Sequence, residues 1–360
     1  MIEPRPHLRA LLRTGPGAPG RSRLLRLDMN ENPDGLPEAF VRAALADIDG
    51  GALATYPEYA GLVDKIAASC GLDARQVFLA NGSDAAIKAL FEAYVAPGDT
   101  VLLTDPTFAM YPVYCRMFQA KAEVVAYRED LAFPFETFLE RLAAKPRLAV
   151  LINPNNPTGQ ALALPQLEAF AAAAAAHDVL AVVDEAYFHY LGVTAMPLVA
   201  RHEGLVVLRT FSKLCGLAAA RLGFAAADAN IVTALNTVNP TFAANGLAVH
   251  LAERLLDAPE VLEEQMAAFR RGKAYLLRAL DAAGIPRREG AGNFVLLPFP
   301  DRAREIAAGL RERGVLVASG FGHPGLRDCI RVTVGGEASM ERFVAALSAV
   351  LEERARHGRE

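Results

Sequence analysis

The sequence predicts an α/β fold: a three-layer sandwich with a mainly parallel sheet, followed by a smaller α+β domain. Short, almost continuously apolar runs such as residues 148–152 alternate with longer helical stretches. Such runs are typical of strands that are buried on both faces of a parallel sheet. At 360 residues the chain is also too long for one ordinary core. We therefore expect two domains.

Strands and helices alternate from about residue 36 to about residue 245. The predicted strands are 76–80, 100–104, 123–127, 148–152, 180–183, 205–209 and 222–226. The predicted helices between them are 61–69, 84–95, 135–143 and 165–177. This alternation is the pattern of parallel strands joined by helical crossovers. We therefore assign residues 36–245 to the large domain.

The two ends of the chain have different patterns. Residues 1–35 are rich in arginine, proline and glycine, and they predict an irregular N-terminal arm. After about residue 245, a long amphipathic stretch (246–283) is interrupted near Pro259. The β-like segments that follow it are 293–297, 315–317 and 329–334. The sequence thus predicts a small α+β domain over residues 246–360, which is joined to the large domain by a long helix.

Composition and charge exclude several classes of function. The chain has 52% hydrophobic and 22% charged residues, as in soluble globular proteins. Its net charge of −4 provides no basic surface for nucleic acid or anionic lipid. No apolar run is long enough to span a bilayer, and the N-terminal residues do not resemble a signal peptide. The four cysteines have no metal-ligand spacing, so we expect a cytoplasmic protein without a metal.

A lysine and an aspartate follow two of the predicted strands. Lys213 lies just after strand 205–209, and Asp184 lies 29 residues earlier, at the end of strand 180–183. An enzyme that uses pyridoxal 5′-phosphate (PLP) needs such a pair: the lysine forms a Schiff base, and the carboxylate keeps the pyridine nitrogen protonated. Either residue alone would more often be a solvated surface residue. The prediction therefore depends on further motifs.

A candidate phosphate site lies at the start of the predicted helix 84–95. Ser83 and Asp84 follow a glycine there, and the N–H groups at a helix N-terminus favour an anion. The Ser212 hydroxyl and the Arg221 guanidinium could complete the site, because arginine binds phosphate in a bidentate manner. A helix cap without a ligand and a surface arginine are the alternatives.

Candidate contacts to the cofactor ring follow other strands. The loop 153–159 (Asn-Pro-Asn-Asn-Pro-Thr-Gly) comes at the carboxyl end of strand 148–152, where open α/β sheets bind ligands. Tyr187 is placed to reach the phenolic oxygen of the ring, and Phe108 to stack on the ring. An ordinary loop and ordinary core aromatics are the alternatives.

Together these motifs resemble the class I/II aminotransferases of fold type I, which use PLP, and in particular the histidinol-phosphate aminotransferase family. The resemblance covers nearly the whole chain, and the motifs occur in the family's order. They are residues 28–33, 56–59, 81–84, 105–108, 153–159, 184–187, 209–213 and 331–335. The resemblance implies an aminotransferase that uses PLP as its cofactor.

The resemblance also implies roles for residues at the cofactor. Lys213 matches the lysine that binds PLP, and Asp184 matches the partner of the pyridine nitrogen. Asn156 and Tyr187 match the donors to the phenolic oxygen, while Phe108 stands where the family usually has a stacking tyrosine. The residues that match the phosphate site are Ser83, Asp84, Ser212 and Arg221.

Three further residues are matched around the substrate. Arg331 matches the arginine that binds the anionic group of the substrate, and Asn32 matches a residue that lines the substrate mouth. Tyr56 matches a tyrosine that reaches the cofactor phosphate of the neighbouring subunit. The resemblance therefore implies a homodimer with its sites at the subunit interface, acting on a small amino donor and a keto acid acceptor.

One departure from the family concerns the substrate. The family commonly has a phosphate-binding arginine directly after a strand of Gly-Ile-Leu-Val type, and here that position is Ala318. Arg327 could substitute from nearby. The sequence predicts a ping-pong aminotransferase of an amino acid or a histidinol-phosphate-like amine. A decarboxylase, cyclase or oxidase on the same scaffold stays open, because the reaction depends on which Cα bond stands perpendicular to the ring.

Overall fold

The computed structural model describes residues 2–9, 11 and 20–357. Its centre is a seven-stranded sheet with the order β2-β8-β7-β6-β5-β3-β4. The strands are β2 (Val77–Ala80), β3 (Thr100–Asp105), β4 (Lys121–Ala126), β5 (Leu148–Ile152), β6 (Leu180–Asp184), β7 (Leu205–Thr210) and β8 (Gly223–Ala226). Neighbouring strands are parallel except at β8, which is antiparallel to β2 and to β7. The mainly parallel sheet is confirmed, and each predicted strand end lies within two residues of the observed one.

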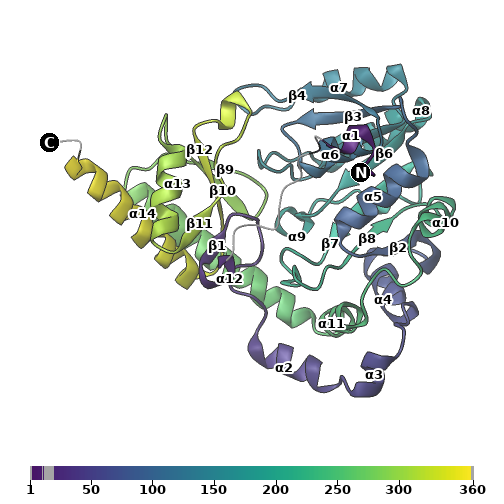
Figure 1. Ribbon diagram of the computed structural model, residues 1–360, viewed down its shortest axis with the longest axis horizontal. Helices are drawn as coiled ribbons and strands as arrows, with labels where there is room; N and C mark the ends of the chain where they lie inside the picture. The colour runs from purple at the N-terminus through teal and green to yellow at the C-terminus, as the bar shows by residue number, and fades with distance from the viewer. Residues whose placement is uncertain (1, 10, 12–19, 358–360) are drawn as a thin grey trace.

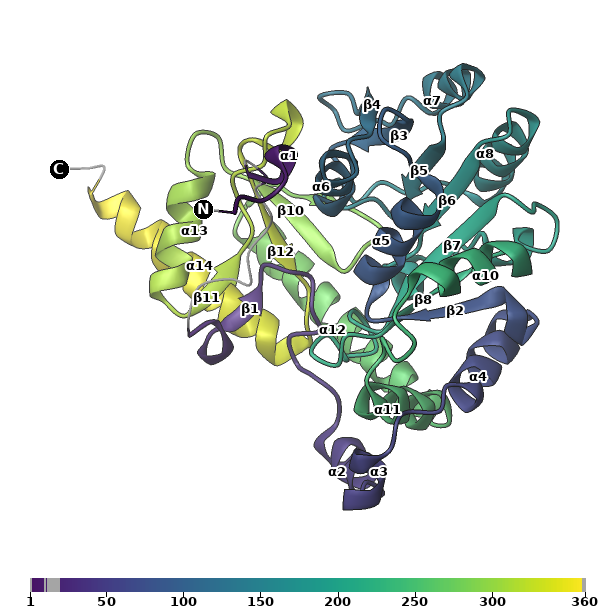
Figure 2. The same ribbon diagram turned by 45° about the vertical axis from the view of Figure 1, so that its right-hand side comes forward.

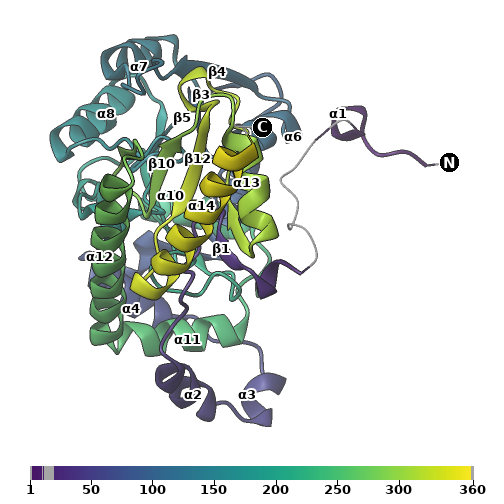
Figure 3. The same ribbon diagram turned by 90° about the vertical axis from the view of Figure 1, so that its left-hand side faces the viewer.

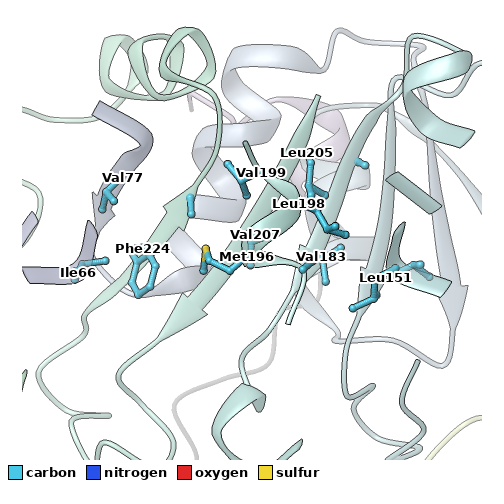
Figure 4. Close-up of a cluster of buried hydrophobic side chains, with 14 of the residues drawn as sticks. Ile66, Val77, Leu151, Val183, Met196, Leu198, Val199, Leu205, Val207 and Phe224 are labelled. Carbon is cyan, nitrogen blue, oxygen red and sulfur yellow. The ribbon is translucent and has the colours of Figure 1, made fainter. Parts of the chain in front are cut away.

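Helices cover both faces of this sheet, which confirms the predicted three layers (Figure 2). On one face pack α5 (Ser83–Tyr94), α6 (Met110–Met117) and α10 (Ala229–Val238). On the other face pack α4 (Ala60–Cys70), α7 (Phe135–Arg141), α8 (Leu164–Ala176) and α11 (Gly246–Leu256). Figure 4 shows part of this second core, where Leu151, Val183 and Val207 project from three neighbouring strands.

The side chains of the central strands alternate between the two cores. On β6, Val182 packs in the core beneath α5 and α6, whereas Val183 packs in the opposite core. The same period of two directs Asp184 toward the side of α5 and α6, and Glu185 toward the other side. The alternation therefore decides which of these two acids faces the predicted phosphate site.

A second, smaller unit lies beside the large sheet (Figures 1 and 3). It contains the antiparallel strands β9 (Arg288–Glu289), β10 (Phe294–Pro298) and β12 (Cys329–Thr333), and a parallel pair of β1 (Leu25–Leu27) with β11 (Val315–Val317). The helices α12 (Pro259–Ala282), α13 (Ala303–Glu312) and α14 (Glu337–His357) accompany these strands. A smaller α+β domain is thus confirmed, while the domain boundaries at residues 35 and 245 stay predictions.

The N-terminal segment is less irregular than predicted. It contains a short helix, α1 (Pro6–Arg9), and the strand β1, in which Leu25 and Leu27 are buried in the core of the small unit. A strand of three residues within an arginine- and glycine-rich stretch has too little pattern to be recognised from sequence. Most of residues 10–19 lie outside the described part of the chain.

The remaining elements connect these units. They are α2 (Glu38–Ala46), α3 (Gly50–Ala54), α9 (Phe188–Leu191) and the 3₁₀ turns at Arg21–Arg23, Ala74–Gln76, Leu142–Ala144, Met196–Leu198 and Pro324–Leu326. Within the ranges that the structure describes, no helix is both long and apolar enough to cross a membrane. The same ranges contain no group of three or more potential metal ligands.

Candidate active site

Most of the predicted site residues gather at the carboxyl ends of parallel strands. Asp184 ends β6, the loop with Asn156 follows β5, and Lys213 lies three residues after β7. Because these strands are parallel neighbours, their carboxyl ends share one edge of the sheet, where such folds bind ligands. β12 of the small unit reaches the same place through a hydrogen bond from Arg331 to Asn156.

Asp184 is a buried carboxylate, with 3% of its surface exposed. Its Oδ2 accepts a hydrogen bond of 3.0 Å from the Tyr111 hydroxyl, and its Oδ1 accepts one of 3.1 Å from the backbone N–H of Ala186. Burial raises the pKa of Asp184 to about 6, although both hydrogen bonds and the positive charge of Lys213 act in the opposite direction. A carboxylate in this setting is stabilised by a cation placed against it.

Lys213 is half-buried, and its Nζ donates a 3.0 Å hydrogen bond to the carbonyl of Met29. The same nitrogen lies 5.6 Å from the centre of the Tyr187 ring. Burial lowers the pKa of Lys213 to about 8, and the nearby cations Arg331 and Arg221 lower it further. At pH 7 about a tenth of such an amine is neutral, and hence nucleophilic, which is far more than for an ordinary lysine.

Tyr187 is a buried phenol between the two units of the chain. Its hydroxyl accepts a 2.9 Å hydrogen bond from Asn30 Nδ2. Burial raises the pKa of Tyr187, while Arg331 and the hydrogen bonds from Asn30 and Asn156 act in the opposite direction. A neutral phenol can donate its proton to an oxygen of a ligand.

Arg331 is a guanidinium with 8% of its surface exposed and no carboxylate partner among the described residues. Its Nη1 donates to Asn156 Oδ1, and its Nη2 donates to the carbonyl of Asp28. Its Nε has no hydrogen-bond partner in the described part of the chain. Burial lowers the pKa of Arg331. Because an unpaired buried charge is unfavourable, this side chain is suited to an anionic ligand.

The predicted phosphate residues lie together at the start of α5. Arg221 Nη1 donates a 3.3 Å hydrogen bond to Ser212 Oγ, and its guanidinium is packed against Gly82, one residue before Ser83. β8 is packed against the same turn: a Cβ on Gly223 would lie 2.4 Å from the Ser83 nitrogen. The helix terminus, the Ser212 hydroxyl and the Arg221 guanidinium thus lie close together, an arrangement that can hold an anion.

The remaining predicted residues have other surroundings. Asp84 Oδ1 accepts a 3.0 Å hydrogen bond from Tyr114, while Phe108 makes an edge contact with Tyr111 at 6.3 Å between ring centres. Asn32 donates to Gln265 Oε1 (2.7 Å) and, at 3.5 Å, to the carbonyl of Leu214. The structure therefore does not bring Asn32 into hydrogen-bond contact with Lys213, Tyr187 or Arg331.

Tyr56 lies apart from these groups. It is 73% exposed, and its ring stacks on Phe242 with 4.3 Å between the ring centres and 15° between the planes. Among the described residues, no hydrogen bond joins the Tyr56 side chain to the other predicted site residues.

Sequence reasoning missed two residues that contact the site. Tyr111 donates to Asp184, and Asn30 donates to Tyr187. Tyr111 stands only three residues after Phe108, so its position near the end of β3 was the available signal. Asn30 belongs to the motif 28–33, in which only Asn32 was assigned a role.

The site geometry agrees with what comparison with known proteins finds. Residues 22–347 match the model of the aminotransferase class I and II family. The chain belongs to this family. The resemblance predicted from the motifs is confirmed, and with it the PLP cofactor and the aminotransferase activity.

The relatives of this aminotransferase carry one recurring name. This chain is 33% identical to histidinol-phosphate aminotransferase of Caldanaerobacter subterraneus subsp. tengcongensis, over 91% of this chain and 93% of the relative. It is 36% identical to histidinol-phosphate aminotransferase 1 of Thiobacillus denitrificans, over 96% and 93% respectively.

Solved structures share the fold of this aminotransferase. Histidinol-phosphate aminotransferase from Sinorhizobium meliloti, in complex with PLP, matches with a TM-score of 0.88 and 23% identity over 97% of each chain. A double mutant of Thermus thermophilus aspartate aminotransferase matches with a TM-score of 0.81 and 23% identity, over 97% of this chain and all of the other. At these identities the comparison establishes the fold-type I architecture and no finer property.

Proposed function

We propose that this aminotransferase holds PLP between Lys213, Asp184 and the anion site at the start of α5, and that Arg331 binds the carboxylate of an α-amino acid. One observation carries the proposal. An amine, a carboxylate and a guanidinium converge on one place, and none of the three has an ion-pair partner among the described residues. Buried charges are normally paired, so their arrangement supports a ligand that carries complementary charges.

The residues present fit the cofactor. The pyridine nitrogen, when protonated, would supply the cation that Asp184 lacks, and the phosphate would supply the anion that suits Ser83, Ser212 and Arg221. Asn156 and Tyr187 would hold the phenolic oxygen, with Phe108 against the ring. These assignments use every unpaired charge of the site except Arg331, which leaves that guanidinium for the substrate.

The protein residues have separate tasks in the reaction. When bound, PLP supplies an electron-withdrawing ring that stabilises negative charge at the substrate's α-carbon. Lys213 would hold the cofactor through Nζ until the amino group of the substrate takes its place. The freed Nζ would then accept the proton from the α-carbon and return it on the cofactor's side of the substrate nitrogen. A pKa of about 8 suits both directions of this transfer near neutral pH. Asp184 keeps the ring nitrogen protonated.

The substrate proposal rests on charge. Arg331 provides one guanidinium for one anionic group, and Ala318 stands where the family resemblance implies a second arginine. A phosphate monoester dianion beside a single buried arginine would be under-compensated, whereas an α-carboxylate would be matched. An ordinary α-amino acid is therefore preferred over histidinol phosphate, the substrate in the names of the relatives.

Assembly and location form the last part of the proposal. Tyr56 and Phe242 are exposed aromatic residues, and Leu53 and Leu247 are also exposed. Together they favour a homodimer in which Tyr56 enters the phosphate site of the partner, because large exposed apolar residues favour protein contacts. A cytoplasmic location suits the four free cysteines.

Two measurements test the proposed function. Borohydride reduction of the protein loaded with PLP, followed by peptide mapping, should place the adduct on Lys213, and Lys213→Ala should carry none. Attachment to another lysine would overturn the site. A screen of amino donors with keto acid acceptors should show transamination, and release of CO₂ or H₂O₂ in its place would indicate a decarboxylase or an oxidase.

A further inference from the structure

Three consecutive residues of the N-terminal segment each contact a different residue of the site. The carbonyl of Asp28 accepts from Arg331, the carbonyl of Met29 accepts from Lys213, and the side chain of Asn30 donates to Tyr187. Of these three contacts, only the last is made by a side chain. Asn30 is therefore the one of these three residues that contacts the site through a side-chain hydrogen bond.

The direction of the Asn30 hydrogen bonds follows from its neighbour Thr333 on β12. The backbone N–H of Asn30 donates to Thr333 Oγ1 at 3.1 Å, and Thr333 Oγ1 lies 3.0 Å from Asn30 Oδ1. The hydroxyl accepts from this N–H with a lone pair and donates its own proton to Asn30 Oδ1. The amide of Asn30 is thus oriented with its oxygen toward Thr333 and its NH₂ group toward Tyr187.

This orientation decides what the Tyr187 hydroxyl can do. Its oxygen accepts from Asn30 Nδ2 at 2.9 Å, so the one phenolic proton is left to be donated elsewhere. Asn30 has 1% of its surface exposed and Thr333 has none, so water does not compete for these bonds. We propose that Asn30 and Thr333 are positioning residues that commit the Tyr187 proton to the phenolic oxygen of the cofactor.

The inference rests on the proposed function, because it needs Tyr187 at the phenolic oxygen. The charged groups that face Tyr187 are Arg331 from β12, Asp184 from β6 and Lys213 after β7. Each of them acts on Tyr187 through space, whereas Asn30 acts through a hydrogen bond to the phenolic oxygen atom itself. The chain Thr333–Asn30–Tyr187 also starts two residues from Arg331 on the same strand, and so joins the substrate arginine to the cofactor ring.

Variants at Asn30 can remove the donor while keeping the backbone. Asn30 has a φ of 55°, in the left-handed region, which glycine adopts readily and aspartate tolerates better than most residues. Asn30→Gly removes the amide, and Asn30→Asp keeps an acceptor for Thr333 but has no proton for Tyr187. Thr333→Val removes the hydroxyl that orients the amide, and Thr333→Ser retains it. Asn236→Ala, on the exposed side of α10, is the matched control for loss of an asparagine.

The readout is the pH midpoint at which the visible absorbance of the bound cofactor changes. Loss of a donor to a negatively charged oxygen makes the neighbouring proton harder to remove, so the midpoint moves to higher pH. We expect Asn30→Gly and Thr333→Val to raise it by roughly half a unit to one unit, the size of one hydrogen bond. Asn30→Asp should raise it as well, while Thr333→Ser and Asn236→Ala should leave it at the parent value.

A double variant separates positioning from a general structural effect. Tyr187→Phe alone should raise the midpoint, and adding Asn30→Gly to it should produce no further rise, because Asn30 acts only through the Tyr187 hydroxyl. An unchanged midpoint in Asn30→Gly, or equal shifts from Asn30→Gly with and without Tyr187, would overturn the inference. Absence of PLP binding by the parent protein, or an unchanged midpoint in Tyr187→Phe, would overturn the proposed function instead.

Discussion

Ala318, directly after β11, is paired with Arg331 on β12 by two backbone hydrogen bonds. The Ala318 N–H donates to the Arg331 carbonyl at 3.1 Å, and the Arg331 N–H donates to the Ala318 carbonyl at 2.8 Å. Residues paired in this way in antiparallel chains project their side chains to the same side, with about 5.5 Å between their Cα atoms. The methyl group of Ala318 therefore projects to the same side as the Arg331 side chain. An arginine at this position would place a second cation beside the first.

This pairing predicts a change of substrate preference. Ala318→Arg should raise kcat/KM for histidinol phosphate and lower it for the best α-amino acid, because two guanidinium groups match a phosphate dianion better than a carboxylate. Steady-state kinetics with both substrates measure the ratio, and Ala318→Gln controls for side-chain size without charge. Turnover of histidinol phosphate by the parent enzyme with kcat/KM above about 10⁴ M⁻¹s⁻¹ would contradict the substrate proposal.

The acidity of Lys213 predicts how PLP attachment depends on pH. The neutral amine is the nucleophile, and the pKa of Lys213 is lowered to about 8 by burial and by neighbouring arginines. The rate of PLP attachment to the apoprotein should therefore rise with pH and level off above about 8. Stopped-flow absorbance measures this rate, with Lys213→Ala as the control. A rate that still climbs with pH up to about 10, as for an ordinary lysine, would refute the lowered pKa.

The sequence was sufficient for the parts of the structure that depend on local pattern. Apolar runs such as 148–152 predicted the central strands, because a strand that is buried on both faces must be apolar along its length. Asp184 was identified because it ends such a strand, and Lys213 because it lies shortly after another. Parallel packing then brings strand ends together without any further information from side chains.

The contacts that sequence did not reveal are those between distant segments. Tyr111 and Asp184 are separated by 73 positions, and Asn30 and Tyr187 by 157. No periodicity or spacing records which of several polar residues in a motif points inward. Asn30 differs from Asn32 in its left-handed backbone conformation, which turns its amide toward Tyr187. In that conformation its backbone N–H donates to Thr333, 303 positions away.

Asp184 should be needed for turnover rather than for cofactor binding. Asp184→Asn keeps the size of the side chain but no longer favours a protonated ring nitrogen, so the variant should bind PLP and lose most of its activity. Absorbance reports the bound cofactor, and a transamination assay reports the turnover. Activity within a few-fold of the parent would show that the carboxylate is not the partner of the pyridine nitrogen.

The same carboxylate should make the apoprotein less stable as pH rises. The pKa of Asp184 is raised from 3.8 to about 6 in the folded state, mainly by burial, so the unfolded chain releases this proton first. Its contribution to stability is full below pH 3.8 and is lost as pH rises through about 6. The loss amounts to about 3 kcal/mol.

Chemical denaturation of the apoprotein between these pH values measures this loss, with Asp184→Asn as the control. The free energy of unfolding of the parent should fall relative to that of the variant as pH rises. Acids that do not interact with Asp184 titrate alike in both proteins, so their effects cancel in the difference. Parallel curves for the two proteins would show that Asp184 has an ordinary pKa.

Subunit exchange tests whether Tyr56 serves the partner's site. Tyr56→Ala and Lys213→Ala should each be nearly inactive, but a hybrid dimer of the two has one site with Lys213 from one chain and Tyr56 from the other. Both defects fall in the second site of the hybrid. About half of the dimers in the mixture are hybrids with one intact site, so mixing should restore about a quarter of the parent activity.

Asp184→Ala mixed with Lys213→Ala is the control. Both of these residues would act in their own chain, so each site of that hybrid keeps a defect. Recovery in the first mixture alone is expected, and recovery in neither, with exchange verified by mass spectrometry of tagged chains, would mean that Tyr56 acts within its own chain or not at all.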